Sequence, residues 1–469
     1  MNLSAFRIWI VGLVLVGIFA ASAWALFAGS PAAILGVALA YMTYELAVAG
    51  LLTFAAVLGI ARWRRTKRVD APLPSVAVLI AAYNERDFIL STLDSIRENG
   101  GMPCEVIIAS DGSTDGMNEL LVQKLGMVAD GPSQFRTPTS PAIRLLALPK
   151  LGKGAALNRA LELVEADVVV TLDADTTLGE NALSELVAPF RDADVDAAAG
   201  FVYVRNARKN VLTRYQFTEY VKNFVWRIGL ARLGVCLQVS GAFGALRTRT
   251  LKGIGGFSEN SLVEDYEVIY RLHDARRTLG QPYRIVAVPG AAAFTEVPEQ
   301  WGNFIQQRTR WFTGFLQTLW DYRRMIVSRK HGAVGLFMLP IKCVDATLPF
   351  WGLTSLVFLI VSAATRHEKW ELWAAGLFFG KWLIDAAMYA GMVIWHRSAF
   401  PERKPVPRTA TQLATCTTES LGFNWLRQVA VIRAYAWFFR RTHRWEQPRW
   451  QSSALAANET EPATSTQAA

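Results

Sequence analysis

Long apolar runs at both ends of the chain flank a central region in which charged and apolar residues are mixed. Each run is long enough to cross a hydrocarbon core, which needs about 20 helical residues. Residues 70–330 instead have the alternating texture of a water-soluble fold. We therefore predict a globular domain inserted between N- and C-terminal transmembrane helices, which occupy residues 8–28, 31–61, 333–363 and 371–395.

The orientation of this arrangement follows from its basic residues. The first run resembles a signal peptide, but a second run follows at once, so residues 1–69 are interpreted as a transmembrane hairpin. Arginines and lysines gather in residues 62–68 and 323–330, between the central domain and its flanking spans. Basic residues favour the cytoplasmic side. We predict a multi-pass protein of the cell inner (plasma) membrane, with a cytoplasmic catalytic domain over 70–299 and two further spans in 333–400.

Three short and almost wholly apolar runs in the central domain are typical of buried parallel strands. They cover residues 76–82, 105–109 and 168–172, and helix-like stretches such as 87–98 and 153–165 separate them. This order predicts an α/β domain with a mixed, mostly parallel sheet. Each run ends in polar residues, and ligands bind beyond the carboxyl ends of such strands, so these ends should converge on one crevice.

The remaining segments are less regular. The proline-bearing stretch 126–144 is expected to be a surface loop. Residues 300–332 predict an amphipathic helix at the membrane surface. Arginines interrupt the apolar stretch 417–439, so for 401–451 we favour a cytoplasmic interfacial helix over a fifth span. Residues 452–469 are expected to be a disordered tail.

Composition excludes several classes of function and of structural site. The 469 residues carry a net charge of +10, which in a membrane protein indicates basic loops against anionic lipids, and no motif for nucleic-acid binding accompanies it. The four cysteines are scattered, with no Cys-x-x-Cys pair. Structural zinc and disulfides are therefore not expected.

A pair of carboxylates follows the third predicted strand. Asp173 and Asp175 are separated by one residue, and oxygen ligands in this arrangement suit Mg²⁺ or Mn²⁺ held by a diphosphate. A solvated turn would have the same sequence. The ends of the other strands carry Asp111, a candidate acceptor for a base or ribose, and Tyr83 with Glu85, which offer an aromatic face and a further acceptor for a pyrimidine.

Two later segments are candidates for catalysis. Glu264 and Asp265 precede a helical pattern, where they could cap a helix or supply the carboxylate base that an inverting transfer needs. Gln307, Arg310 and Trp311 lie close together on the predicted interfacial helix. Arg310 could bind a diphosphate and Trp311 could stack on a sugar, or both could serve only to hold the helix at the membrane.

The ordered set of these motifs resembles the family 2 membrane glycosyltransferases, which include cellulose, chitin, hyaluronan and poly-N-acetylglucosamine synthases. The resemblance covers roughly residues 74–315. Its motifs are Tyr83-Asn84-Glu85, Asp111-Gly112, Asp173-Ala174-Asp175, Glu264-Asp265 and Gln307-x-x-Arg310-Trp311.

The resemblance implies a GT-A nucleotide-sugar-binding fold with a UDP-sugar donor. In it Tyr83, Glu85, Asp111, Lys153 and Asp173 contact the donor, and Asp173 with Asp175 holds Mg²⁺ or Mn²⁺. Asp265, beside Glu264, becomes the catalytic base, while Gln307, Arg310, Trp311 and Gly241 face diphosphate and acceptor. The implied activity is extension of a β-linked polysaccharide. The alternative is transfer of a single sugar to a lipid or polyprenyl-phosphate acceptor.

The sequence departs from the family 2 membrane glycosyltransferases in two respects and has one unusual feature. Val263 stands where the family often has threonine, and the chain has fewer C-terminal spans than polymer-secreting synthases, which leaves room for an export partner or a homo-oligomer. Charged pairs, Lys342 with Asp345 and Lys381 with Asp385, interrupt the two C-terminal spans. They are expected either to line a route for the glycan or acceptor or to neutralise each other.

Overall fold

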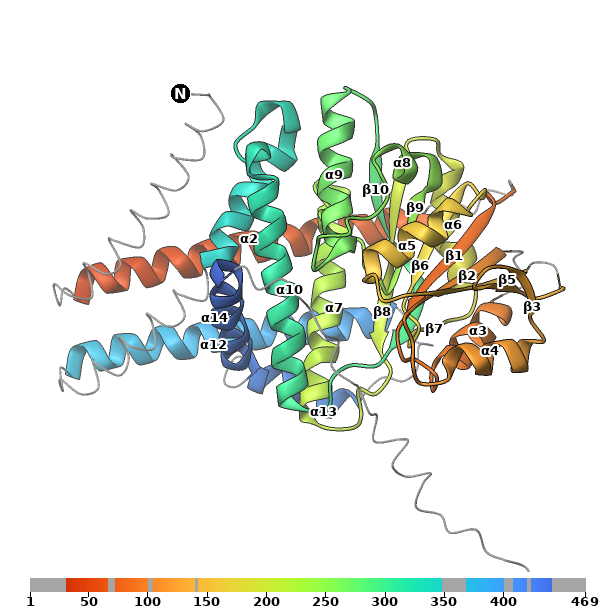
Figure 1. Ribbon diagram of the computed structural model, residues 1–469. Helices are drawn as coiled ribbons and strands as arrows, with labels where there is room; N and C mark the ends of the chain where they lie inside the picture. Colours follow the sequence, from red (N-terminus) through yellow and green to blue (C-terminus); the bar gives the residue numbers. More distant parts are fainter. Residues whose placement is uncertain are drawn as a thin grey trace, which may run out of the picture.

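A computed structural model describes residues 31–65, 72–99, 104–139, 142–347, 368–399, 408–419 and 423–440. The predicted first span and the predicted C-terminal tail lie outside these ranges, as do residues 348–363 of the predicted third span. Figure 1 shows an α/β domain on one side of the molecule and long helices on the other.

The domain is built on one ten-stranded sheet with the strand order β3-β4-β5-β2-β1-β6-β9-β8-β10-β7. At its centre β5, β2, β1 and β6 run parallel, while β9 is antiparallel to both of its neighbours. The predicted mixed α/β sheet is confirmed. The strands are β1 (Val76–Ala82), β2 (Cys104–Asp111), β3 (Val128–Gly131), β4 (Gln134–Arg136), β5 (Ile143–Leu148), β6 (Val168–Leu172), β7 (Thr177–Leu178), β8 (Val195–Val204), β9 (Phe243–Arg247) and β10 (Arg284–Thr295).

The central strands are mostly apolar because helices cover both of their faces. In β1, Val78 and Ile80 pack with α3 (Ile89–Arg97) and α4 (Met117–Leu125), whereas Ala77 and Leu79 point to the other face and pack with α5 (Lys153–Glu162). The side chains of a strand alternate between its faces, so a strand buried on both sides has few polar positions. Strands β1 and β6 have the predicted bounds, and β2 contains the predicted run 105–109.

The stretch 126–144 differs from the prediction. It contains the antiparallel strands β3 and β4, and β4 also pairs with β5 at the edge of the sheet. Gly131, with φ of +143°, is the last residue of β3 and leads into the turn between them. The prolines in this stretch fall outside the paired residues, so they indicated a loop without excluding a short hairpin.

The helices divide between those that cover the central sheet and those in the other half of the molecule. Those against the sheet are α3 (Ile89–Arg97), α4 (Met117–Leu125), α5 (Lys153–Glu162), α6 (Ala182–Val187), the 3₁₀ turn η1 (Ala188–Arg191), α8 (Thr248–Gly253) and α9 (Glu264–Thr278). The others are α2 (Pro31–Arg65), α7 (Val211–Arg232), α10 (Trp301–Asp321), η2 (Arg323–Met325), η3 (Arg329–His331), the π-helical turn η4 (Val334–Met338), α12 (Glu368–Ala399), α13 (Thr409–Thr418) and α14 (Asn424–Arg440).

Helices α2 and α12 lie side by side and project away from the sheet (Figure 1). Among the described residues, Met42–Trp63 of α2 is the one helical stretch both long and apolar enough to cross a membrane. Both helices carry exposed large apolar side chains, including Phe54 on α2 and Leu383 on α12. That residues 371–395 of α12 form a second span stays a prediction.

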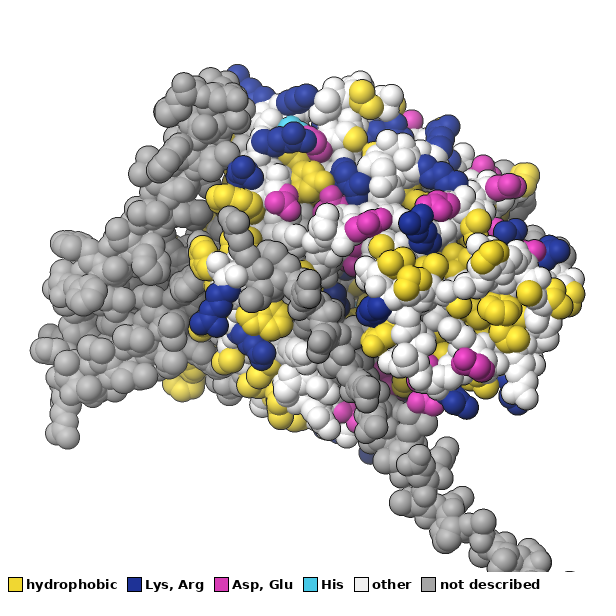
Figure 2. Space-filling view, in the orientation of Figure 1, with side chains coloured by type: hydrophobic (Ala, Val, Ile, Leu, Met, Phe, Trp, Pro, Cys, Tyr) yellow, Lys and Arg dark blue, Asp and Glu magenta, His cyan; other side chains and the backbone are white. Residues whose placement is uncertain are grey.

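The C-terminal helices pack back onto the domain. Helix α14 lies along α10, where the Thr309 and Thr313 hydroxyls are oriented toward carbonyls of Ala430 and Ala434. Near the C-terminal end of α12, His396 Nε2 lies 2.8 Å from the hydroxyl of Tyr203 on β8. On the surface of the α/β domain, acidic and basic side chains are interspersed (Figure 2).

Candidate active site

The polar ends of three neighbouring strands meet at one edge of the sheet. Strand β1 lies between β2 and β6 and is parallel to both. Tyr83 follows β1, Asp111 is the last residue of β2, and Asp173 follows β6. Because these carboxyl ends lie side by side, the predicted convergence of the three positions is present.

Asp111 is buried and held by the loop that follows β5. Its carboxylate accepts hydrogen bonds from the backbone N–H groups of Leu151 (2.5 Å) and Gly152 (3.0 Å) and pairs with Lys150 Nζ at 3.0 Å. The same ammonium lies 3.2 Å from the centre of the Tyr83 ring. These contacts leave Asp111 rigidly oriented and put an aromatic face beside it.

Gly112 makes this close approach possible. It has φ of +74°, and a Cβ at this position would lie 2.9 Å from the backbone nitrogen of Lys150. A side chain here would push the β5 loop away from the end of β2. Backbone geometry therefore requires glycine at position 112, in addition to the chemical role predicted for Asp111.

Lys153, the first residue of α5, joins two of the predicted groups. Its Nζ lies 2.8 Å from Asp173 Oδ1 and 3.1 Å from Glu264 Oε1. Burial disfavours the ammonium, but the carboxylates of Asp173, Glu264 and Asp265 outweigh this and raise the pKa of Lys153. The charged lysine thus links the end of β6 to the start of α9.

Asp175 and Glu85 stand in a concentration of negative charge. Asp175 Oδ1 accepts hydrogen bonds from Thr176 and Thr295, each at 3.1 Å. Burial and then the neighbouring Asp173 raise the pKa of Asp175 to about 6. Burial, followed by Asp175 and Asp173, raises the pKa of Glu85 to about 9.

The donor set suits a hard divalent cation only in part. Asp173 and Asp175 offer carboxylate oxygens, the ligands that Mg²⁺ and Mn²⁺ prefer. Across the described ranges, no group of three or more His, Cys, Asp or Glu side chains is placed to hold a metal ion. The two aspartates thus fit a cation that takes its remaining ligands from substrate phosphate and water, as Mg²⁺ commonly does.

Asp265 lies in the first turn of α9 and faces the loop before β9. The backbone N–H of Gly241 donates a hydrogen bond to Asp265 Oδ2 at 2.7 Å. Burial and then Glu264 raise the pKa of Asp265 to about 6, although Lys153 and the Gly241 N–H oppose the shift. Neither acid caps α9 through its side chain.

Helix α10 places the predicted residues Gln307, Arg310 and Trp311 next to α9. Arg310 Nη1 donates to the carbonyl of Leu262, just before α9, at 2.9 Å. Arg308 hydrogen-bonds to the side-chain oxygen of Gln307, pairs with Glu219 at 2.6 Å and lies 4.1 Å from the centre of the Trp311 ring. One face of the predicted stacking residue is therefore occupied by a guanidinium.

Several residues at the site were not singled out in the sequence. Lys150 orients Asp111 and Tyr83, Arg205 donates to the backbone carbonyl of Asp175 at 3.3 Å, and Thr295 contacts its carboxylate. The loop 149–153 follows an apolar run and ends in Lys153, so its position after a strand could have identified Lys150. Arg205 and Thr295 come together only through the pairing of β8 with β10.

A cavity of about 340 Å³ lies among α2, α7, α9, α12 and α14. Lys342, Asp345 and Asp385 of the two predicted charge pairs contribute to its lining, together with Trp226, Tyr266 and Arg427. Lys342 Nζ lies 2.9 Å from Asp345, and Lys381 Nζ lies 2.5 Å from Asp385 and 2.9 Å from Glu45. Each lysine is thus paired with at least one carboxylate, and both pairs have a member that faces the cavity.

Relatives of this chain were found by sequence. A probable glycosyltransferase of Bacillus subtilis (strain 168) is 30% identical over 280 residues, 58% of this chain and 59% of the relative. A poly-β-1,6-N-acetyl-D-glucosamine synthase of Staphylococcus epidermidis is 25% identical over 308 residues, 65% of this chain and 69% of the relative. A β-monoglucosyldiacylglycerol synthase of Nostoc sp. is 27% identical over 306 residues, 64% of this chain and 61% of the relative. The chain thus spans about three fifths to two thirds of these relatives.

A solved structure and two family models complete the comparison. A mannosyltransferase of Pyrobaculum calidifontis, solved with GDP-mannose and Mn²⁺, has a TM-score of 0.52 and 20% identity, covering 87% of this chain and 99% of that one. This likeness concerns the fold. The glycosyl transferase family 2 model matches residues 77–249, and the glycosyl transferase family group 2 model matches residues 168–379. Together the matches span more than half of the chain, which therefore belongs to the family 2 glycosyltransferases.

Proposed function

We propose that this protein is a membrane-bound inverting glycosyltransferase that takes a UDP-sugar and extends a β-linked polysaccharide. The observation that carries the proposal is the link from Asp173 through Lys153 to Glu264 and Asp265. It joins the candidate donor side of the crevice to the candidate base. A site that only bound a nucleotide would have no need of the buried acids on α9.

On the donor side, the base and ribose would lie between Tyr83 and Asp111, at the ends of β1 and β2. Once Lys150 moves aside, Asp111 could accept a hydrogen bond from a ribose or base donor group in its place, and Tyr83 could offer its ring. Lys153 would contact the donor sugar or diphosphate from the start of α5. Glu85 completes the donor-side group.

Asp173 and Asp175 would hold Mg²⁺ or Mn²⁺ together with the donor diphosphate. The cation would supply charge stabilisation for the leaving diphosphate. The cluster of Glu85, Asp173 and Asp175 supports this assignment, since close carboxylates are more stable beside a cation. The fold relative from Pyrobaculum calidifontis, solved with Mn²⁺, is in agreement.

Asp265 would act as general base on the acceptor hydroxyl. As its Oδ2 is held by the Gly241 N–H, the other carboxylate oxygen is available to take the proton. The deprotonated oxygen would attack the anomeric carbon from the face opposite the diphosphate, so that configuration inverts. Glu264 holds Lys153 and tunes Asp265 by its charge.

The acceptor would enter from the membrane side. Gln307, Arg310 and Trp311 lie on α10, against the start of α9, where they could contact both acceptor and diphosphate. The cavity beyond them, among α2, α7 and α12, offers a path for a growing glycan. Its charges and aromatic side chains suit a polar chain with sugar faces.

Transfer of one sugar to a lipid is the second candidate. The β-monoglucosyldiacylglycerol synthase among the relatives favours it, as does the apolar stretch Met42–Trp63 beside the cavity. Both functions use the same donor chemistry and differ in the acceptor. In either case the catalytic domain would be cytoplasmic, at the inner membrane, and membrane lipids would be partners. A polysaccharide synthase would also need an export partner or a homo-oligomer.

The deciding experiment supplies radiolabelled UDP-glucose, UDP-N-acetylglucosamine or GDP-mannose, each with Mg²⁺ or Mn²⁺, to the full chain in detergent and sizes the product. Long polymer from one donor supports the polysaccharide synthase. A short product that forms only with added lipid supports the second candidate. Transfer from GDP-mannose alone would overturn the UDP-sugar assignment.

A further inference from the structure

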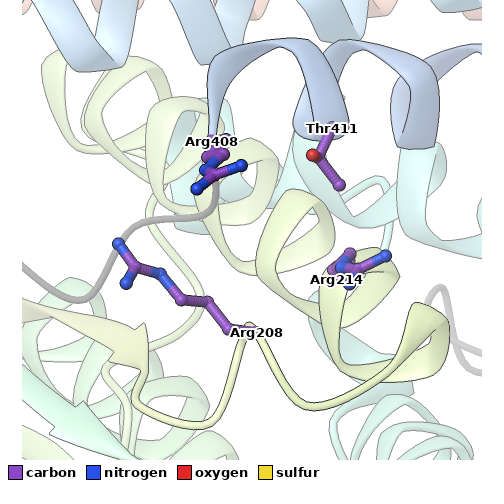
Figure 3. A pocket seen from close by; sticks show the side chains of 4 residues that line it. All are labelled: Arg208, Arg214, Arg408 and Thr411. Carbon is purple, nitrogen blue, oxygen red and sulfur yellow. The ribbon is translucent and has the colours of Figure 1, made fainter.

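A second polar pocket lies between the N-terminal end of α7 and the start of α13. It has a volume of about 360 Å³ and is lined by Arg208, Arg214, Arg408 and Thr411 (Figure 3). Arg208 precedes α7, Arg214 lies in its first turn, and Arg408 and Thr411 lie at the start of α13. Three guanidinium groups from two chain segments that are nearly 200 residues apart in sequence therefore share one space.

Nothing described in the structure neutralises two of these three charges. Within the ranges that the structure covers, no carboxylate pairs with the side chains of Arg214 or Arg408. Arg408 is exposed and Arg214 is half-buried, so water reaches both. Like charges this close repel, and the arrangement is most stable when an anion occupies the pocket.

The backbone adds to the positive character. Arg408 is the N-cap of α13 and makes no side-chain capping hydrogen bond. Thr411, in the first turn of α13, is part of the lining. The first N–H groups of a helix favour a negative group, so helix and arginines act in the same direction.

We propose that this pocket binds a phosphate group. The planar fork of arginine matches the oxygens of phosphate, and the two or more unesterified oxygens of one phosphate can accept hydrogen bonds from more than one guanidinium group at once. The pocket is separate from the candidate active site, and this inference does not depend on the proposed function. An anionic phospholipid headgroup and free phosphate both present this chemistry.

The position of the pocket favours the lipid. Helix α13 packs on both α7 and α12, and near the C-terminal end of α12 His396 Nε2 lies 2.8 Å from the hydroxyl of Tyr203, five residues before Arg208. Helix α12 carries exposed apolar side chains up to Ile394, close to its end. The pocket thus lies where this apolar surface meets the domain, and basic residues at such a level attract anionic lipid.

Binding is measured on the full chain in a nonionic detergent, by thermophoresis and thermal shift. The probes are dioctanoyl phosphatidylglycerol, the phosphate-free dioctanoylglycerol, and inorganic phosphate. We expect saturable binding of phosphatidylglycerol that weakens about tenfold or more in Arg214→Gln/Arg408→Gln. The matched control, Arg136→Gln/Arg249→Gln, removes two exposed arginines of the α/β domain and should bind as the unmodified protein does.

The binding results distinguish a phospholipid headgroup from free phosphate as the ligand of the pocket. Arginine-dependent binding of inorganic phosphate as tight as that of the lipid would support the phosphate site and assign it to a free anion. Equal binding of dioctanoylglycerol, or equal loss in the control pair, would overturn the proposal. Should the double variant not fold, Arg408→Gln alone serves, since this side chain is exposed; unchanged lipid affinity in that variant would also count against the site.

Discussion

The backbone N–H of Gly241 donates a 2.7 Å hydrogen bond to Asp265 Oδ2. A Cβ on Gly241 would lie 3.2 Å from Asp265 Cβ and 3.3 Å from Oδ2. The loop before β9 and the first turn of α9 are thus fitted to each other around this carboxylate. Its orientation depends on a residue that carries no side chain.

Gly241→Ala should therefore displace the Asp265 carboxylate by a few tenths of an ångström. We expect kcat to fall about threefold to tenfold, since small misplacements of a catalytic group are costly, while donor affinity stays the same. Steady-state kinetics with separate donor titration would measure both. Gly253→Ala is the matched control, because a Cβ there meets nothing within 4 Å; equal kinetics in the two variants would contradict the role of this contact.

Asp265→Asn should remove the base while keeping the shape of the side chain. We expect transfer to drop by about 10²–10⁴-fold, the usual contribution of a general base. Donor binding, measured by calorimetry, should persist. Normal turnover in this variant would show that another group takes the proton.

The pH dependence of transfer should report the ionisation of Asp265. Its pKa is raised to about 6, so the base form is lost as the pH falls through this value, and kcat should fall on the acid side. Burial and then Glu264 raise this pKa, so Glu264→Gln should move the acid limb to lower pH. A limb that stays in place or moves upward in this variant would exclude Asp265 as its origin.

Removal of divalent metal should abolish transfer if Asp173 and Asp175 hold a cation with the diphosphate. EDTA is expected to reduce product to background, and Mg²⁺ or Mn²⁺ should restore it. Asp175→Ala should stay inactive at every metal concentration, whereas Asp94→Ala, with its side chain 64% exposed, should respond as the unmodified protein does. Full activity in EDTA would refute the metal assignment.

The buried pair Arg308–Glu219 should contribute to stability. Both side chains are less than 10% exposed, so Glu219→Gln leaves an arginine charge with a weaker partner. We expect the melting temperature to fall by roughly 5–10 °C. Glu162→Gln breaks the exposed pair with Arg159 and should change it by about 1 °C or less. A similar shift in both variants would be evidence against a special role for the buried pair.

A variant of the Lys342–Asp345 pair tests whether these residues line a path for the glycan or only neutralise each other. Lys342→Leu/Asp345→Ala removes one pair without leaving a single charge. If the cavity is the acceptor route, product length or use of the lipid acceptor should fall while cleavage of the donor by water persists. Unchanged products from a stably folded variant would assign the pair to structure alone.

The class of fold and the candidate chemistry could be predicted from the amino-acid sequence, because both depend on local patterns. Apolar runs flanked by polar residues identified β1, β2 and β6, and their order placed Asp111 and Asp173 at one edge of a sheet. Parallel strands meet at a common edge whatever the details of packing. The hairpin β3–β4 escaped prediction because its residues lie at an exposed edge and have no apolar period.

The contacts among the predicted site residues could not be predicted, because they depend on tertiary packing. Lys153 and Glu264 are over 100 residues apart, and their contact depends on how α5 and α9 pack on the sheet. The shielding of Trp311 by Arg308 requires Glu219 from α7, and the arginine pocket requires α13 to return to the start of α7. Long-range contacts of this kind arise from the packing of whole elements, and no local pattern of residues encodes them.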